Sequence, residues 1–228
     1  MHRGVRFAVL GAYAVLFAAT AWAWVAAPSG ATFAVHWGLN GAANRVAGRE
    51  ALLVAPGVAA LVGALVAVAV RFDPHRANLM GNGRVPGLAI GVLTVATTLL
   101  LIGVQAAIAA TGFGYDVRLD RAAPIGIGLL FAALGSVLPQ VHRNYTFGIR
   151  LPWTLASESA WDATHRAVGR LWIALGAAVA ATGAIGGGGL SIALLLVGIV
   201  ASLIAASVVA YRAWAIDPQA HGTRPTRR

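Results

Sequence analysis

The residue types that can support chemistry are concentrated in one stretch, residues 144–170, which mixes polar, charged and aromatic side chains. Glu158, Asp162 and His165 are spaced so that, on a helix, they share roughly one face. Carboxylates and an imidazole in that arrangement can bind a metal ion or transfer protons. No second cluster of such residues accompanies them, and a solvated helix with a structural histidine explains the same spacing. We favour that second interpretation and predict no metal site, cofactor or catalytic residue.

The local signals in this stretch predict an irregular segment followed by a helix. Gly148 and Pro152 both disfavour regular helix between them. Thr154 or Ser157 can cap the helix that follows by accepting hydrogen bonds from its first free amides. Asp162 and Arg166 are placed to form an ion pair one turn apart. We therefore expect a short amphipathic helix at the membrane interface, leading into a membrane span.

The elements that must position this stretch are six long apolar blocks. The chain has 228 residues, of which 59% are hydrophobic and 11% charged, whereas soluble domains carry about 25% charged residues. A hydrocarbon layer requires helices of about 17–25 apolar residues. The composition predicts an all-α integral membrane protein with six transmembrane helices. We expect these spans at residues Phe7–Ala27, Ala51–Val70, Pro86–Ala110, Ala122–Leu138, Leu171–Ile185 and Leu190–Ala210.

The basic residues predict the orientation of these spans. All seventeen are arginines, and they lie between the apolar blocks. With the amino terminus inside, thirteen lie in inner segments and four (Arg45, Arg49, Arg118 and Arg121) in outer loops. The positive-inside rule then predicts a multi-pass protein of the cell membrane with both termini cytoplasmic. The alternative that the net charge of +10 serves nucleic-acid binding is disfavoured, because the charge follows the span ends.

Two features of the amino-terminal half leave alternatives open. The first block could be a signal peptide cleaved after Ala21-Trp22-Ala23, but it is longer than a typical apolar signal region, and we favour retention as a span. Thr94, Thr98 and Gln105 lie within the third block and could line a hydrated cavity. A small transporter or channel is therefore the alternative function.

The absence of cysteine excludes disulfides and cysteine catalysis.

The polar stretch carries a long, irregular motif. It consists of Asn144, Gly148, Ile149, Arg150, Pro152, Trp153, Thr154, Leu155, Ser157, Trp161, Thr164, His165 and Arg166. This motif resembles the signature of the SdpI family, which is named for immunity to a secreted sporulation-delaying toxin. Leu151 stands where that family often has threonine. The predicted partner-facing or structural residues also include Glu158. An intramembrane enzyme, using His165 with Glu158 or Asp162 and with His142 or Arg143, is the second alternative function.

A weaker resemblance concerns the first outer loop, residues 28–50. His36, Asn40 and Gly41 are similar to the mark of an uncharacterised domain that often precedes the SdpI region. An exposed Asn-Gly turn explains the same residues equally well. We accordingly divide the chain into a three-span region (1–112), an SdpI-like three-span region (113–216) with a cytoplasmic signature loop (142–170), and a disordered basic tail (217–228).

The resemblance implies a membrane protein of toxin immunity, transmembrane signalling, or both. Its partners are then the lipid bilayer, a secreted peptide toxin outside and a transcriptional repressor inside, with no direct contact to nucleic acid. On that analogy the outer loop faces the toxin. Residues 144–169 of the signature loop form the inward-facing element, either as a partner surface or as loop architecture.

Overall fold

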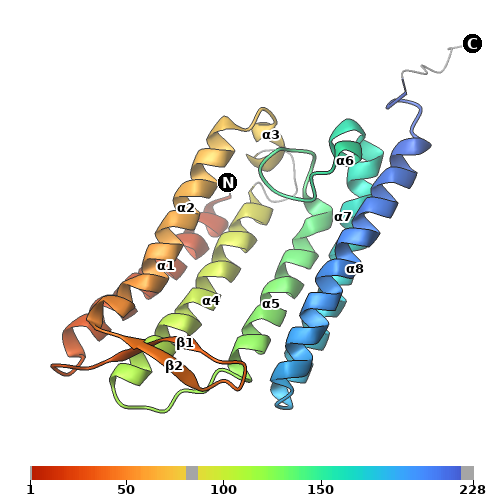
Figure 1. Ribbon diagram of the computed structural model, residues 1–228. Helices are drawn as coiled ribbons and strands as arrows, with labels where there is room; N and C mark the ends of the chain where they lie inside the picture. The colour runs from red at the N-terminus through yellow and green to blue at the C-terminus, as the bar shows by residue number, and fades with distance from the viewer. Residues whose placement is uncertain (1, 81–86, 222–228) are drawn as a thin grey trace, which may run out of the picture.

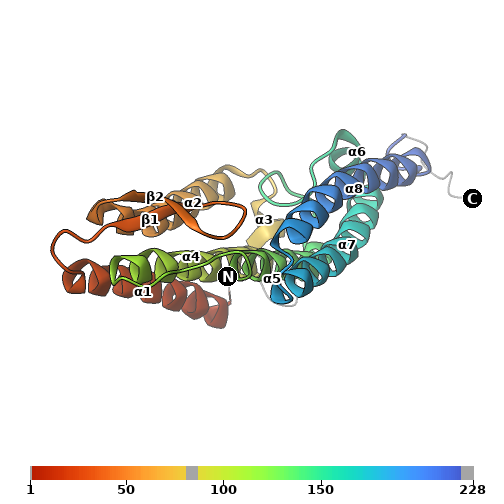
Figure 2. The same cartoon turned by 60° about the horizontal axis from the view of Figure 1, so that its bottom comes forward.

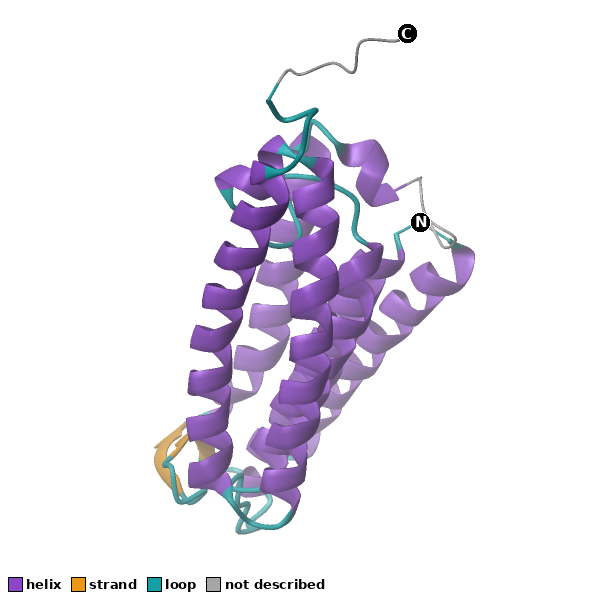
Figure 3. Cartoon of the chain, turned by 90° about the vertical axis from the view of Figure 1, so that its right-hand side faces the viewer, coloured by secondary structure: helices purple, strands orange, loops and turns teal. Residues whose placement is uncertain are grey.

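The computed structural model describes residues 2–80 and 87–221. Within them, six helices are long and apolar enough to cross a membrane, which confirms the predicted all-α integral membrane fold. They run nearly side by side, and the two short strands lie together at one end (Figures 1 and 3). The helices that form the spans are α1 (Arg3–Ala26), α2 (Val54–Phe72, after a 3-10 helix at Arg49–Leu53), α4 (Leu88–Gly112), α5 (Ala122–Val137, followed by a 3-10 helix at Leu138–Gln140), α7 (Glu158–Ala184) and α8 (Gly188–Ala215).

The helices form two groups of three, α1, α2 and α4 in one and α5, α7 and α8 in the other (Figure 2). Both described ends of the chain lie at the same end of the molecule, which we call the terminal face (Figure 1). The opposite end, which carries the strands, is the hairpin face. The predicted start of the third span at Pro86 lies outside the described residues, and α4 begins at Leu88.

The second group packs closely because glycines face each other across it. A side-chain carbon at Gly128 of α5 would collide with the α7 backbone at Gly176 and Ala180. One at Gly135 would meet the carbonyl of Gly169. Small residues allow such close approach between membrane helices, where no hydrophobic force drives association. On α8, Ser202, Ala206 and Ala210 are buried in the same way.

The first outer loop contains more structure than the sequence analysis expected. Strands β1 (Phe33–Trp37) and β2 (Ala43–Ala47) pair antiparallel, with Phe33 opposite Ala47 and Trp37 opposite Ala43. Phe33 is fully buried against Gly112 at the end of α4, so the hairpin is anchored to the first helix group. Alternate residues of β1, including Phe33 and Val35, pack against the apolar cluster at the ends of α1 and α4.

The helix before the fifth span differs from the prediction. The expected separate amphipathic helix is instead the first part of α7, which runs without a break from Glu158 rather than starting at Leu171. Nothing in this segment breaks the helix once Ser157 has capped it. A different short helix, α6 (Pro152–Ala156), precedes it. Residues 222–228 of the predicted disordered tail lie outside the described residues, whereas Asp217 makes side-chain hydrogen bonds.

Candidate functional site

The signature loop folds around the side chain of Asn144, which is fully buried at the terminal face. Its Oδ1 accepts hydrogen bonds from the backbone N–H groups of Thr146 (2.8 Å) and Phe147 (2.6 Å). Its Nδ2 donates to the carbonyls of His142 (2.8 Å) and Phe147 (2.9 Å). One amide side chain thus satisfies four backbone groups that lie outside regular structure, and these bonds fix the turn.

Trp161 and His165, one turn apart on α7, form the interior of the loop. Their rings stack with centroids 4.1 Å apart. The indole Nε1 of Trp161 donates to the carbonyl of Val141 (2.6 Å). His165 Nδ1 donates to the carbonyl of Trp161 (2.7 Å), and Nε2 accepts from the N–H of Ile149 (3.0 Å). Because one partner can only accept and the other can only donate, the ring is held as the neutral Nδ1–H tautomer.

Gly148 lies directly against this pair. Its φ of 120° is a backbone conformation that side chains disfavour. A side-chain carbon there would press on Nε2 of His165 and on the ring of Trp161. Glycine is therefore required at this position both by backbone conformation and by space, which accounts physically for its place in the signature.

Two hydroxyls terminate the loop and start α7. Thr154 Oγ1 accepts from the N–H of Leu151 (2.9 Å) and donates to the carbonyl of Ile149 (2.8 Å), which closes the turn before α6. Ser157 Oγ accepts a hydrogen bond from the N–H of Ala160 (3.1 Å) and is the N-cap of α7. Of the two predicted caps, Thr154 and Ser157, it is therefore Ser157 that caps this helix. The predicted ion pair between Asp162 and Arg166 is present at 3.7 Å.

Asp73, which the sequence analysis did not single out, joins the two helix groups at the terminal face. Its carboxylate is 7% exposed and accepts hydrogen bonds from the N–H groups of His75 (2.7 Å) and Tyr145 (2.8 Å) and from Thr146 Oγ1 (2.6 Å). Burial raises the pKa of the Asp73 carboxyl, but these hydrogen bonds outweigh it and hold the pKa below its usual value. The Asp73 carboxylate is therefore a buried acceptor that connects the end of α2 to the signature loop.

A second missed contact ties the end of α8 to the signature loop. The carboxylate of Asp217 accepts hydrogen bonds from the hydroxyls of Ser157 and Ser159. The Ser157 hydroxyl is the main cause that lowers the pKa of the Asp217 carboxyl below its ordinary value. Arg143 and Asn78 add contacts at the same face, since Arg143 donates to the carbonyl of Leu155 (3.0 Å) and Asn78 to that of Arg143 (2.7 Å).

Four of the remaining predicted positions lie at the surface, whereas Trp153 and Thr164 do not. Arg150, Pro152, Glu158 and Arg166 are exposed. Arg150 still donates to the carbonyl of Tyr145. Trp153 is half-buried and packs edge-on against Tyr211 of α8, with ring centroids 5.6 Å apart. Thr164 is fully buried, and its hydroxyl has no partner among the described residues. The structure thus separates the signature into an interior that builds the loop and a small exposed set.

The geometry of the predicted residues gives the catalytic alternative no support. Both ring nitrogens of His165 are occupied by backbone partners, so neither is available for proton transfer. Glu158 is exposed, and Asp162 pairs with Arg166. Arg143 is bonded to Leu155, and His142 is exposed. Within residues 2–80 and 87–221, no three His, Asp or Glu side chains are grouped as a metal site.

The residues of the transport alternative do not share one cavity. The hydroxyls of Thr94 and Thr98 donate to the carbonyls of Ile90 and Thr94 one turn earlier. The hollow beside them measures about 10 Å³, which is room for roughly one water. Gln105 borders a different hollow, of about 280 Å³, between α1 and α4.

The predicted outer-loop residues lie at the hairpin face. His36 Nδ1 and Asn44 Oδ1 are 2.6 Å apart. Asn40 and Gly41 form the tip, where Asn40 Oδ1 accepts from Ala42 and Gly41 has a φ of 75°. The Asn-Gly turn, one of the two interpretations of these residues, is therefore present. The tip is fixed to the α4–α5 loop, because Leu119 N–H donates to the Gly41 carbonyl (3.0 Å) and Arg118 to that of Asn40 (2.8 Å).

Comparison with known proteins identifies the segment that builds the terminal face. Residues 140–211 match the SdpI/YfhL protein family. We call this stretch the SdpI-family region, after the family that it resembles. This region spans the signature loop, α6, α7 and most of α8, and it contains the hydrogen bonds that Asn144, Trp161 and His165 make within the loop.

One curated protein that the chain is similar to is the Immunity protein SdpI of Bacillus subtilis (strain 168). It is 27% identical over 82 residues, which cover 36% of this chain and 40% of the relative. The match therefore spans well under half the length of that protein. No solved structure matches the chain.

Proposed function

We propose that this protein is a membrane immunity protein that protects the cell producing it against a secreted, membrane-directed toxin. The observation that carries the proposal is the match of residues 140–211 to the SdpI/YfhL family, with a relative that is named an immunity protein. The matched residues form one folded unit, because Asn144, Trp161 and His165 bind backbone groups of the same loop. The family match therefore includes the buried side chains that fix the conformation of the signature loop.

The proposed orientation places the terminal face in the cytoplasm and the hairpin face outside. Thirteen of the seventeen arginines belong to inner segments in this orientation. The chain has no cysteine, so single cysteines can be introduced without background. We expect Leu39→Cys, at the exposed hairpin tip, to react with a membrane-impermeant maleimide in intact cells. Gln219→Cys, exposed at the terminal face, should react only after permeabilisation. The opposite pattern would reverse the assignment of the two faces.

The exposed part of the signature loop is the proposed contact for a cytoplasmic partner, such as a transcriptional repressor. Arg150 and Glu158 project from it with opposite charges, and the loop beneath them is fixed by buried hydrogen bonds. A rigid support with exposed charges suits recognition of a partner, because little conformational entropy is lost on binding.

The test is survival of a toxin-sensitive bacterial strain that produces this chain, with membrane levels measured for each variant. We expect the parent chain to protect. Arg150→Ala should reduce protection at an unchanged membrane level, whereas Arg212→Ala, another exposed arginine on the same face but outside the loop, should not. Absence of protection by the parent at a normal membrane level would overturn the immunity proposal. Full protection by Arg150→Ala would overturn the proposal that the exposed part of the signature loop contributes to immunity.

A further inference from the structure

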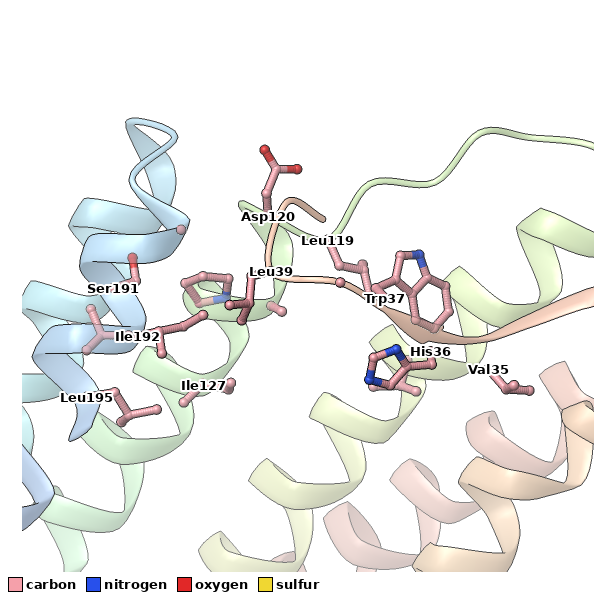
Figure 4. Close-up of a pocket in the computed structure, with 16 residues that line it drawn as sticks. Val35, His36, Trp37, Leu39, Leu119, Asp120, Ile127, Ser191, Ile192 and Leu195 are labelled. Carbon is pink, nitrogen blue, oxygen red and sulfur yellow. The ribbon is translucent and has the colours of Figure 1, made fainter. Parts of the chain in front are cut away.

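A cavity of about 400 Å³ lies beneath the hairpin tip, between the two helix groups. Its roof is formed by Leu39 and Leu119, and its walls by the hairpin-side ends of α4, α5, α7 and α8 (Figure 4). The wall side chains include Val104, Ile127 and Leu195. The volume falls within the range of about 300–1,000 Å³ that is typical of ligand sites.

The polar side chains that border the cavity already have partners within the protein. His36 pairs with Asn44 (2.6 Å), and Ser191 bonds Thr182 (2.8 Å). Asp120 lies 3.6 Å from the Arg118 guanidinium, and Figure 4 shows its carboxylate directed away from the cavity. The cavity therefore offers its occupant dispersion contacts and few free hydrogen-bonding groups. The part of the ligand that enters it must be hydrocarbon.

The position of the cavity points to the bilayer as the source of that hydrocarbon. Its walls are residues of the membrane-spanning helices. A second hollow of about 270 Å³ shares Val104, Ala123 and Ile127 with it and continues along α4 past Leu99 and Gly103. In Figure 2, α2 and α8 stand apart on the same side of α4 and α5. An acyl chain can therefore reach the cavity along the seam between the helix groups without crossing polar surface.

A cation that suits a phosphate lies close to the cavity. Arg121 does not line the cavity itself; it is exposed at the start of α5, between the lining residues Asp120 and Ala123. Its guanidinium extends towards Gly186 in the α7–α8 turn. Its side chain has no hydrogen-bond or ion-pair partner within the described part of the chain. Arginine binds phosphate oxygens through paired N–H groups, at the depth where lipid headgroups lie.

We propose that this cavity binds an anionic phospholipid of the leaflet on the hairpin side, with an acyl chain beneath the hairpin tip and the phosphate at Arg121. The bound chain fills the space between the hairpin of the first helix group and α8 of the second. It thereby supports the hairpin against the SdpI-family region. This assignment is independent of the immunity proposal and holds for either orientation in the membrane.

The test is native mass spectrometry of the full-length protein, purified in detergent, delipidated and then exposed to equal amounts of phosphatidylglycerol and phosphatidylcholine. We expect one phosphatidylglycerol to be retained per chain. Ala123→Phe fills the cavity from α5, and Leu195→Trp fills it from α8, so both should reduce retained lipid to background. Leu203→Phe adds similar bulk on the exposed face of α8 and should leave retention unchanged. Arg121→Gln should reduce the preference for phosphatidylglycerol by about tenfold, because a charge-assisted contact is lost.

Three results would overturn the proposal. The first is a parent protein that retains only detergent. Retention of an apolar peptide instead of lipid, in a mixture that contains both, would count in the same way. The second is lipid retention in both filled variants equal to that of Leu203→Phe. If Ala123→Phe fails to fold, Leu195→Trp decides this point alone. The third is an unchanged headgroup preference in Arg121→Gln, which would remove the phosphate contact and leave an unspecific hydrocarbon site.

Discussion

The two ends of this helix bundle are packed in different ways. At the terminal face, a long irregular loop is condensed around buried polar groups, and its Asn144 alone bonds four backbone groups. At the hairpin face, a short two-stranded hairpin covers an apolar space of about 400 Å³ that protein atoms leave unfilled. The first end is held mainly by buried polar groups, whereas the second is held by the buried Phe33 side chain and by hydrogen bonds at the hairpin tip.

This difference indicates where each end tolerates change. Buried hydrogen bonds are costly to break, because the remaining partner is left unsatisfied away from water. A substitution in the roof of an apolar space should change the stability of the protein little, because the roof is also exposed on its other side. Substitutions at the terminal face should therefore lower stability, while those at the hairpin face should alter binding.

The strongest test of this comparison is Trp161→Ala. The substitution removes a fully buried ring, its stack on His165 and its bond to Val141. We expect the free energy of unfolding to fall by about 3–5 kcal/mol, measured by thermal or denaturant unfolding in detergent. Trp22→Ala, on an exposed part of α1, is the matched control and should cost far less. Equal losses in the two variants would contradict a special role for the loop interior.

A smaller loss is expected from Gly148→Ala. Its positive φ costs about 1–3 kcal/mol for a residue with a side chain, and the new methyl group also presses on His165. Gly57→Ala, at a helical site with open space, should instead leave stability unchanged or slightly raised. The pair is compared by unfolding midpoints. A neutral Gly148→Ala would show that the loop relaxes without strain.

Asp73→Asn should cost about 1–3 kcal/mol, because the amide cannot replace an ionised acceptor of three hydrogen bonds. The pKa of the Asp73 carboxyl is lowered in the folded protein. Its contribution is therefore complete above the ordinary value of 3.8 and is lost as the pH falls through the folded pKa. The parent should lose more stability than Asp73→Asn on acidification below about pH 4. Asp116→Asn, in an exposed loop, is the control.

Ser157→Ala tests the cap of α7 and should cost about 1 kcal/mol. Ser207→Ala, an exposed serine bonded only to the preceding turn of α8, should change stability by less. At the other end of the molecule, Leu39→Ser at the exposed hairpin tip should stay within about 0.5 kcal/mol of the parent. A large loss at Leu39 would abolish the contrast between the two faces.

The sequence predicted those features that depend on neighbouring residues. The six spans follow from the length of the apolar blocks, and the Ser157 cap and the Asp162–Arg166 pair follow from helix spacing. The contact between Trp161 and His165 could also be predicted, because residues four positions apart lie next to each other on a helix. The alternation of Phe33, Val35 and Trp37 is a short sequence signal for strand β1.

The missed features depend on distant parts of the chain. Asp73 lies among arginine, asparagine and glycine, and nothing local indicates that Tyr145 and Thr146 will bury it. Asp217 similarly meets Ser157 only through the packing of α8 on the loop. The cavity could not be predicted either, because it arises from the spacing between two helix groups.

The contact between Asp73 and Tyr145 also has a consequence for biogenesis. The two residues are separated by 72 positions, and synthesis at about 5–20 residues per second places them roughly 4–14 s apart. During that interval the third and fourth spans must enter the membrane while the Asp73 carboxylate waits in water. Burial of Asp73 therefore requires that the chain is in place at least as far as Tyr145 and Thr146, beyond α5. A protease that cleaves near Asp73 would act preferentially on chains in which this segment has not reached its position.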